Sequence, residues 1–290
     1  MTTPPKKRYF HICSDGNSVD ALFRNVNDFK AAMNRTAVCA LRFHVLILAF
    51  VLMDNHFHFV VLATEDNCIR FINEFKRLTG KYMADTYGEV SLLLRLPVKV
   101  IPVTEEEYLK TLIAYVIKNP TKARLEMFYL YPWGSGSLYF RDKARGDRAV
   151  SCLKDLGSRN IRALCKTRHK LPGDWMISDG MILPENYVAI EEVERLFRTT
   201  RSYMHFLSRN ADAEMEKPLE EWNAINLSDT ELRAERIRLS QHFFGGKTLQ
   251  QMSVPERLKM ARLLRNKYLC SRKQLARIVQ LPYETVLQNL

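Results

Sequence analysis

The sequence predicts an α+β protein, in which an antiparallel sheet with helices packed on it precedes a mostly helical C-terminal region. Two observations lead to this fold class. The apolar run over residues 43–62 is interrupted by the turn-forming triplet Met53-Asp54-Asn55, a pattern typical of a β-hairpin. Around this hairpin, the predicted elements follow the order strand, helix, strand, strand, helix, strand, helix, which is the order of a ferredoxin-like sheet.

Each element follows from the spacing of its apolar residues. The strands are expected over residues 9–13, 43–52, 56–62 and 98–103, and the helices over residues 19–34, 65–87 and 104–119. In the longest helix, Phe71 and Phe75 lie four residues apart and begin a stripe that faces the core. The last helix opens with Thr104 and Glu107 at the spacing of a capping box, and Pro120 is expected to end it.

The hairpin carries two histidines, His56 and His58, in its second strand. Side chains alternate along a strand, so both imidazoles point to one face, while Phe57 and Phe59 point to the other face and into the core. Two imidazoles side by side on a rigid strand are half of a metal site. The alternative is that both are ordinary histidines with satisfied hydrogen bonds.

The second half of a site is expected on the helix over residues 104–119. Tyr115 and Asn119 are four residues apart and therefore share one helix face. A tyrosine phenol can act as a covalent nucleophile, and an asparagine carbonyl can bind a hard cation. The alternative is structural, with Tyr115 in an ordinary buried stripe beside Tyr108 and Leu112.

The charge of the chain indicates an anionic partner. The 290 residues carry a formal net charge of +12, with a pI near 9.4, which favours polyanions and nucleic acid first. On the helix over residues 65–87, Arg70, Arg77 and Lys81 line a face of their own and are candidate DNA contacts. The alternative is a basic face that only meets solvent.

The C-terminal half has a different character from the first half. Three domains are expected, over residues 1–145, 146–240 and 241–290. The middle one is mixed and mainly helical, with a hairpin at Asp179-Gly180 and a helix over residues 191–209. A charged linker is expected over residues 142–148.

The last 50 residues are strongly basic. They hold nine basic and two acidic residues, a net charge of +7 (9 − 2). A helix over residues 272–279, a short turn and a second helix over residues 283–290 predict a DNA-binding helix-turn-helix. Arg272, Lys273 and Arg277 are its candidate DNA contacts. The alternative is a plain helical hairpin.

Several other classes of protein are not expected. None of the six cysteines forms a CxxC pair, which disfavours a zinc ribbon or a redox motif and fits a reducing cytoplasm. The N-terminus has no apolar signal core, and the apolar stretch over residues 45–53 is too short to cross a bilayer. The Gly245-Gly246-Lys247-Thr248 segment lacks a P-loop glycine, because Gln241 occupies its place. A cytoplasmic protein without a membrane partner is predicted.

Several motifs occur together, in order, over about residues 9–140. They are Arg8-Tyr9-Phe10-His11-Ile12, Asp15-Gly16-Asn17, Leu22-Phe23-Arg24, Met53-Asp54-Asn55-His56-Phe57-His58, Phe75-Lys76-Arg77-Leu78-Thr79-Gly80-Lys81-Tyr82, Tyr115-Val116-Ile117-Lys118-Asn119-Pro120-Thr121-Lys122-Ala123 and Tyr131-Pro132-Trp133-Gly134-Ser135. This set resembles the single-tyrosine transposases with a His-hydrophobic-His motif, in particular the REP-associated tyrosine transposases. Two departures exist: Asp54 replaces the usual proline, and residues 89–97 lack a Trp-Gln-x-Arg-Phe-like run.

The resemblance implies a prokaryotic, metal-dependent transposase that cleaves and rejoins single-stranded DNA. Tyr115 would be the nucleophile and form a 5′-phosphotyrosine, while His56, His58 and Asn119 would hold one Mg²⁺ or Mn²⁺. Its substrates would be palindromic repeats that fold into hairpins, and it would act as a monomer or a homodimer. Two alternatives remain. One is a non-catalytic DNA-binding or regulatory protein derived from a transposase. The other is a metal-dependent nuclease that uses water, in which Tyr115 is structural.

Overall fold

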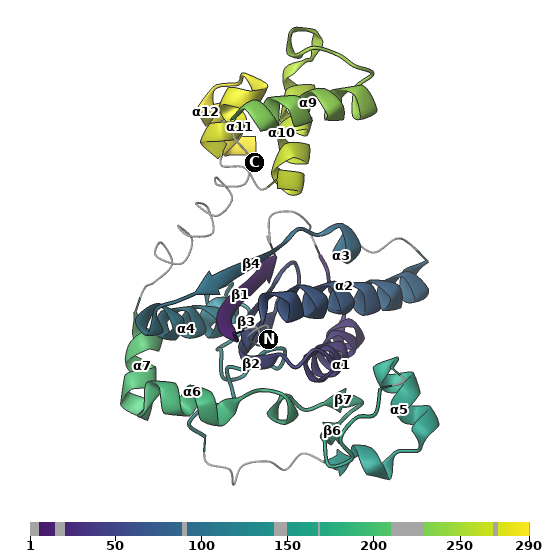
Figure 1. Cartoon of the computed structure of the whole chain (residues 1–290), viewed down its shortest axis with the longest axis vertical. Coiled ribbons are helices and arrows are strands. Elements are labelled where there is room, and N and C mark those ends of the chain that lie inside the picture. The colour runs from purple at the N-terminus through teal and green to yellow at the C-terminus, as the bar shows by residue number, and fades with distance from the viewer. Residues whose placement is uncertain are drawn as a thin grey trace, which may run out of the picture. The chain divides into compact units, whose positions relative to one another are not determined.

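The computed structural model of the chain divides into two compact units, Met1–Asn210 and Ala211–Leu290. Figure 1 shows the elements of both units. The structure describes residues 6–14, 21–88, 92–141, 150–167, 169–209, 229–268 and 272–289. The expected linker over residues 142–148 and the Asp15-Gly16-Asn17 motif lie outside these residues. The expected division at residues 145 and 240 stays a prediction.

The first unit is built on a four-stranded antiparallel sheet. Its strands are β1 (Arg8–Ser14), β2 (Leu46–Leu52), β3 (Phe57–Ala63) and β4 (Val98–Val103), in the spatial order β2-β3-β1-β4. The helices between and after them are α1 (Val26–Arg42), α2 (Glu65–Tyr87), the short α3 (Leu92–Arg95) and α4 (Glu106–Lys122). This order and pairing confirm the predicted α+β, ferredoxin-like class.

The β2–β3 hairpin separates two environments. Its turn is closed by the Met53 amide, which donates to the His56 carbonyl at 2.8 Å. Phe57 and Phe59 are fully buried, and both pack against Phe75 of α2. His58, which lies between them, points to the opposite face. The sheet therefore has an apolar face covered by α2 and a face that carries the histidines.

Several helix boundaries differ from those expected. The helix predicted over residues 19–34 is α1, which begins at Val26 because the Asn25 side chain caps it. The expected Thr104–Glu107 capping box does not form; Glu105 is the N-cap and makes no side-chain cap bond. The helix predicted over residues 191–209 is interrupted at Arg198, whose φ of +66° is incompatible with a continuous helix.

The rest of the first unit packs beside the sheet. It comprises β5 (Ser151–Cys152), α5 (Ser158–Cys165), β6 (Met176–Ser178), β7 (Met181–Ile182), α6 (Ile190–Phe197), α7 (Thr200–Ser208) and short 3₁₀ turns at Leu153–Asp155 and Pro184–Asn186. The expected hairpin at Asp179-Gly180 joins β6 to β7, with positive φ at both turn residues. The Ala189 amide donates to the Ile47 carbonyl at 2.8 Å, which ties this region to the outer strand β2.

The second unit is helical. It comprises α9 (Asp229–Phe243), a 3₁₀ turn at Leu249–Gln251, α10 (Val254–Tyr268), α11 (Arg272–Val279) and α12 (Tyr283–Asn289). Its core includes Leu232 and Leu239 of α9 together with Leu264, Leu275 and Val286 of the later helices. The helix α11 has the bounds expected for the first helix of the helix–turn–helix segment, and α12 begins at the expected residue, Tyr283. Within the described residues, no helix has the length and apolarity needed to cross a bilayer.

Candidate functional site

The two motif histidines lie on the face of the sheet opposite the phenylalanine core. Their ring centroids are 5.1 Å apart, and the rings meet edge to face. His58 is buried, whereas His56, at the end of the hairpin turn, is half-buried. His56 therefore lies nearer to solvent, and His58 lies deeper between the sheet and α4.

Tyr115 approaches the histidines from α4. Its ring centroid is 5.7 Å from that of His58, with the rings nearly perpendicular. The Lys122 ammonium lies 3.9 Å from the centroid of the same tyrosine ring, a cation–π contact between residues two helical turns apart. Tyr115 is half-buried, so its side chain also meets solvent.

Asn119 is oriented by the proline that follows it. Pro120 lies inside α4 rather than at its end, because the helix continues to Lys122. A proline has no N–H, so the carbonyl of Val116 loses its usual helical donor. The Asn119 amide nitrogen donates to the carbonyls of Tyr115 at 3.0 Å and Val116 at 3.5 Å. These bonds turn its side-chain oxygen, Oδ1, away from the helix backbone.

The hydrogen bonds around His56 leave two acceptors facing each other. A neutral imidazole carries one proton. We assign it to Nδ1, which makes the shorter contact, 2.7 Å to the acceptor Oδ1 of Asn55, so that Nε2 holds a lone pair. That Nε2 lies 3.4 Å from Oδ1 of Asn119, also an acceptor. Two such lone pairs repel unless a proton or a cation lies between them.

The spacing of these two acceptors fits a divalent cation. Two ligands at right angles, each about 2.1 Å from an ion, are about 3 Å apart, close to the distance between His56 Nε2 and Asn119 Oδ1. Imidazole nitrogen with amide oxygen is a donor set of intermediate hardness, which suits Mn²⁺. The His58 ring lies beside this pair, with its centroid 5.1 Å from that of His56.

His11 of β1 is part of this site, and the sequence analysis assigned it no role. Its Nε2 lies 2.9 Å from Nδ1 of His58, and the two rings stack with centroids 5.2 Å apart. The strand register explains this pairing. Cys13 lies opposite His58, and His11 lies two residues further along, on the same face. His11 lies 47 residues before His58 on another strand, so their contact could not be predicted until the pairing of the two strands was known.

Cys13 completes a second possible ligand group. The ligand atoms of His11, Cys13 and His58 all lie within 4.8 Å of one another, and the three residues are buried. Thiolate and imidazole are the donors that zinc prefers. This group shares His58 with the His56–Asn119 pair, so one ion in either position would use that ring.

Burial holds the two inner histidines neutral. It lowers the pKa of His58 well below the ordinary value, and the charges of His56, His11, Lys122 and Lys99 act in the same direction. Burial, with a smaller effect of Lys99, lowers the pKa of His11 to about 3. The neutral imidazole is the form that binds a metal, so both rings are suited to it at neutral pH.

The basic residues predicted to touch DNA do not gather at this site. Arg70 lies 3.7 Å from Asp66, Arg77 pairs with Glu74, and Lys81 lies 3.7 Å from Asp85, all along α2. In the second unit, Arg277 pairs with Asp229. The side chains of Arg272 and Lys273 lie outside the described part of the structure.

Comparison with known proteins adds one distant likeness. No family model and no curated protein sequence matches the chain. Among solved structures, the chain is similar to a REP-associated tyrosine transposase bound to a REP hairpin, with 12% sequence identity and a TM-score of 0.35. The match covers 47% of this chain and 81% of that chain.

Proposed function

We propose that this protein is a DNA strand transferase of the transposase kind, which cleaves and rejoins single-stranded DNA through a phosphotyrosine. The observation that carries the proposal is the pair of facing acceptors, His56 Nε2 and Asn119 Oδ1, beside a tyrosine whose ring contacts His58. The resemblance of the ordered sequence motifs to single-tyrosine transposases supports the same assignment.

Each residue has a distinct role in this proposal. His56, His58 and Asn119 would hold Mg²⁺ or Mn²⁺, which would polarise the scissile phosphate and offset the charge that develops on it. For His58 to bind through Nε2, its Nδ1–H must donate to His11 Nε2, so His11 sets the useful tautomer. The Lys122 ammonium, beside the tyrosine ring, contributes positive charge where an anionic phosphate approaches.

Tyr115 performs the bond exchange. Its phenol gives up a proton as the phenol oxygen attacks the phosphorus and forms a P–O bond. The P–O bond to the 3′-oxygen breaks, and that oxygen takes up a proton to become a 3′-hydroxyl. The DNA is left joined to the enzyme as a 5′-phosphotyrosine. A second 3′-hydroxyl can reverse the step, and no nucleotide triphosphate is needed because the bond energy is retained.

The test is to mix the full-length protein with labelled hairpin DNA that carries a single-stranded flank, in the presence of Mn²⁺ or of EDTA. We expect a protein–DNA adduct that survives denaturation, forms with Mn²⁺ and is absent with EDTA. Cleaved DNA without an adduct would instead indicate a nuclease that uses water. Binding without cleavage would indicate a regulatory DNA-binding protein, and adduct formation in EDTA would contradict the cation's role.

A further inference from the structure

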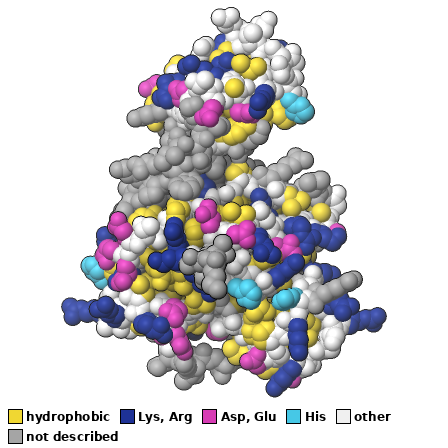
Figure 2. Space-filling model, viewed as in Figure 1, with side chains coloured by type: hydrophobic (Ala, Val, Ile, Leu, Met, Phe, Trp, Pro, Cys, Tyr) yellow, Lys and Arg dark blue, Asp and Glu magenta, His cyan; other side chains and the backbone are white. Residues whose placement is uncertain are grey.

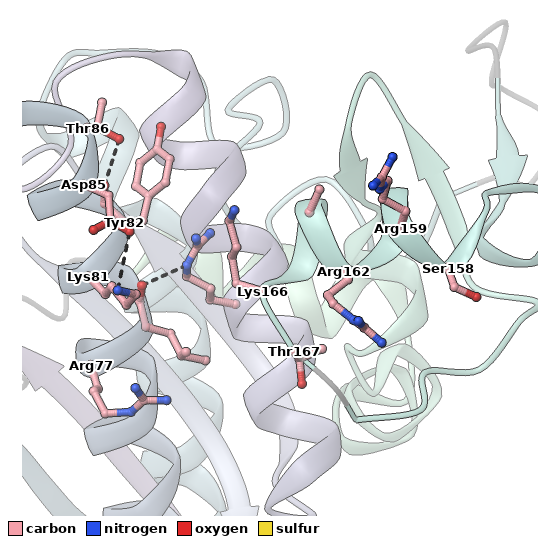
Figure 3. A pocket seen from close by; sticks show the side chains of 13 residues that line it. Arg77, Lys81, Tyr82, Asp85, Thr86, Ser158, Arg159, Arg162, Lys166 and Thr167 are labelled. Atoms are coloured by element: carbon pink, nitrogen blue, oxygen red, sulfur yellow. Dashed lines mark hydrogen bonds and ion pairs between the residues drawn. The ribbon is translucent and has the colours of Figure 1, made fainter.

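A second feature of the first unit is an open groove between α2 and α5, shown in Figure 3. The groove has a volume of about 1330 Å³. Its basic lining residues are Arg35, Arg77, Lys81, Arg159, Arg162 and Lys166, and Asp85 is the acidic residue among the described lining. The formal excess is thus five positive charges. Lys and Arg side chains are also prominent over this part of the surface in Figure 2.

The cations of this groove are arranged along two helices. Arg159 and Arg162 are three residues apart and share one face of α5, and Lys166 is the residue that caps the C-terminus of this helix. Arg77 and Lys81 are four residues apart on α2. From Arg159 to Lys166 the chain advances roughly 10 Å at 1.5 Å per residue, about three nucleotide steps at 3.4 Å each. This extended arrangement fits a polyanion better than a single small anion.

Most of this positive charge is not neutralised within the protein. Arg159, Arg162 and Lys166 are exposed, and no carboxylate in the described ranges pairs with them. Of the other two exposed cations, Arg77 pairs with Glu74 at 2.7 Å. The pair of Lys81 with Asp85 is exposed and 3.7 Å apart, so it contributes little.

Arg35 at the base of the groove gives an independent indication. It is a buried arginine, with 2% of its surface exposed. Its guanidinium donates to the carbonyls of Leu78 at 3.1 Å and Ala31 at 2.6 Å and lies over the Tyr82 ring. No carboxylate among the described residues pairs with it, although buried charges usually have an opposite partner. A bound anion would supply that partner.

The groove is separate from the tyrosine site. It is formed by α1, α2 and α5, and α2 covers the phenylalanine face of the sheet. His58 and Tyr115 lie on the opposite face. A polyanion in this groove would therefore contact the protein away from the reacting phosphate.

We infer that the α2–α5 groove binds the phosphate backbone of DNA at a position distinct from the cleavage site. The choice of DNA rests on the proposed function, whereas the phosphate chemistry rests on the groove alone. The bound segment is either the duplex stem of a hairpin or its single-stranded flank, and the two share the same phosphodiester chemistry. These contacts position the substrate without reading its sequence.

The test compares two double variants of the full-length protein. Arg159→Gln/Arg162→Gln removes two groove cations. Arg195→Gln/Arg201→Gln removes two exposed cations from α6 and α7, outside the groove, and serves as the matched control. Glutamine has a helix propensity close to that of arginine, so both variants should fold. Binding of a fluorescent DNA hairpin, with and without a single-stranded flank, is measured by anisotropy between 50 and 200 mM KCl.

We expect the groove variant alone to lose affinity and salt dependence. Two lost phosphate contacts reduce the slope of log K against log salt by about 1.8 for duplex and about 1.4 for single strands. Over this fourfold change in salt, wild-type affinity should fall about 12-fold more than that of the variant for a stem contact, or about 7-fold more for a flank contact. If the groove variant loses affinity for both probes, the groove binds the duplex stem. If it loses affinity only for the probe with the single-stranded flank, the groove binds the flank.

Other outcomes separate this inference from the proposed chemistry. Equal slopes of log K against log salt for the groove and control variants would overturn the inference. It would also be overturned if poly-glutamate displaced the fluorescent hairpin as effectively as unlabelled DNA of equal charge. If wild-type protein forms no adduct but the groove variant still binds DNA more weakly, the proposed chemistry fails and the groove assignment stands.

Discussion

Replacing His11 by phenylalanine tests how the candidate metal site is organised. His11 Nε2 is 2.9 Å from His58 Nδ1, and the two rings stack at 5.2 Å. A phenyl ring keeps the stacked contact but removes the hydrogen-bond partner. Among the described residues, His58 Nδ1 has no other hydrogen-bond partner. Because His58 is buried, water does not easily take the place of His11. Leaving one buried polar group unpaired costs about 1–3 kcal/mol.

The same substitution removes the hydrogen bond that fixes the tautomer of His58. Without an acceptor at Nδ1, the proton of the neutral ring is no longer held there, and it competes for Nε2, the nitrogen proposed to bind the ion. Loss of such a supporting hydrogen bond lowers metal affinity about 10–100-fold. We therefore expect His11→Phe to need about 10–100 times more Mn²⁺ for half-maximal adduct formation.

Two measurements check this expectation. Free Mn²⁺ is titrated by electron paramagnetic resonance, and adduct formation is followed against Mn²⁺ concentration. His11→Gln is the control, since its side-chain amide places a polar group near the former Nε2, and it should retain most of the affinity. Unchanged Mn²⁺ affinity in a folded His11→Phe protein would show that His58 does not bind the ion through Nε2 and would refute the proposed geometry.

Three further predictions follow from the same structure. Tyr115→Phe should abolish the covalent adduct and leave DNA binding within a few-fold, because only one oxygen is lost; an adduct in this variant would identify another nucleophile. The free energy of unfolding should fall as the pH drops below about 6.5, because the unfolded chain takes up protons that folded His11, with a pKa of about 3, does not accept. At pH 4.5 the loss of unfolding free energy due to His11 is about 2.7 kcal/mol. Urea unfolding should show a smaller loss in His11→Gln than in wild type, whereas His205→Gln, a control at an exposed position, should lose as much as wild type. Equal pH dependence in wild type and both variants would contradict this prediction. Truncation of the chain after residue 210 removes the second unit without cutting through α9. It should weaken DNA binding and reduce the slope of log K against log salt by roughly 2 to 4, for about three to five phosphate contacts. An unchanged slope in a folded protein would mean that the helix–turn–helix segment does not contact DNA.

The sequence by itself determined the sheet and the position of its motifs. The hairpin at Met53-Asp54-Asn55 was predictable, because turn residues and alternating apolar residues act locally. Alternation also placed His56 and His58 on one face and Phe57 on the other, as the structure has them. Helical spacing likewise placed Tyr115 and Asn119 on one face of α4.

Other features depended on contacts that local patterns do not report. Pro120 was expected to end its helix, but α4 continues to Lys122. The Asn119 side-chain amide donates to the Val116 carbonyl, which the proline leaves without its usual donor. The predicted helix over residues 191–209 is broken by the positive φ of Arg198. In the first case a side-chain amide replaces the missing backbone donor, so the helix tolerates the proline.

The tertiary structure alone decided what surrounds the motif residues. His11 reaches His58 because β1 pairs with β3, and the register of two strands is fixed by the whole sheet rather than by either strand. The α2–α5 groove likewise brings Arg77 and Lys81, which the sequence suggested as DNA contacts, together with cations more than 70 residues further along the chain. Local sequence sets which side chains share a face, but long-range packing sets which faces meet.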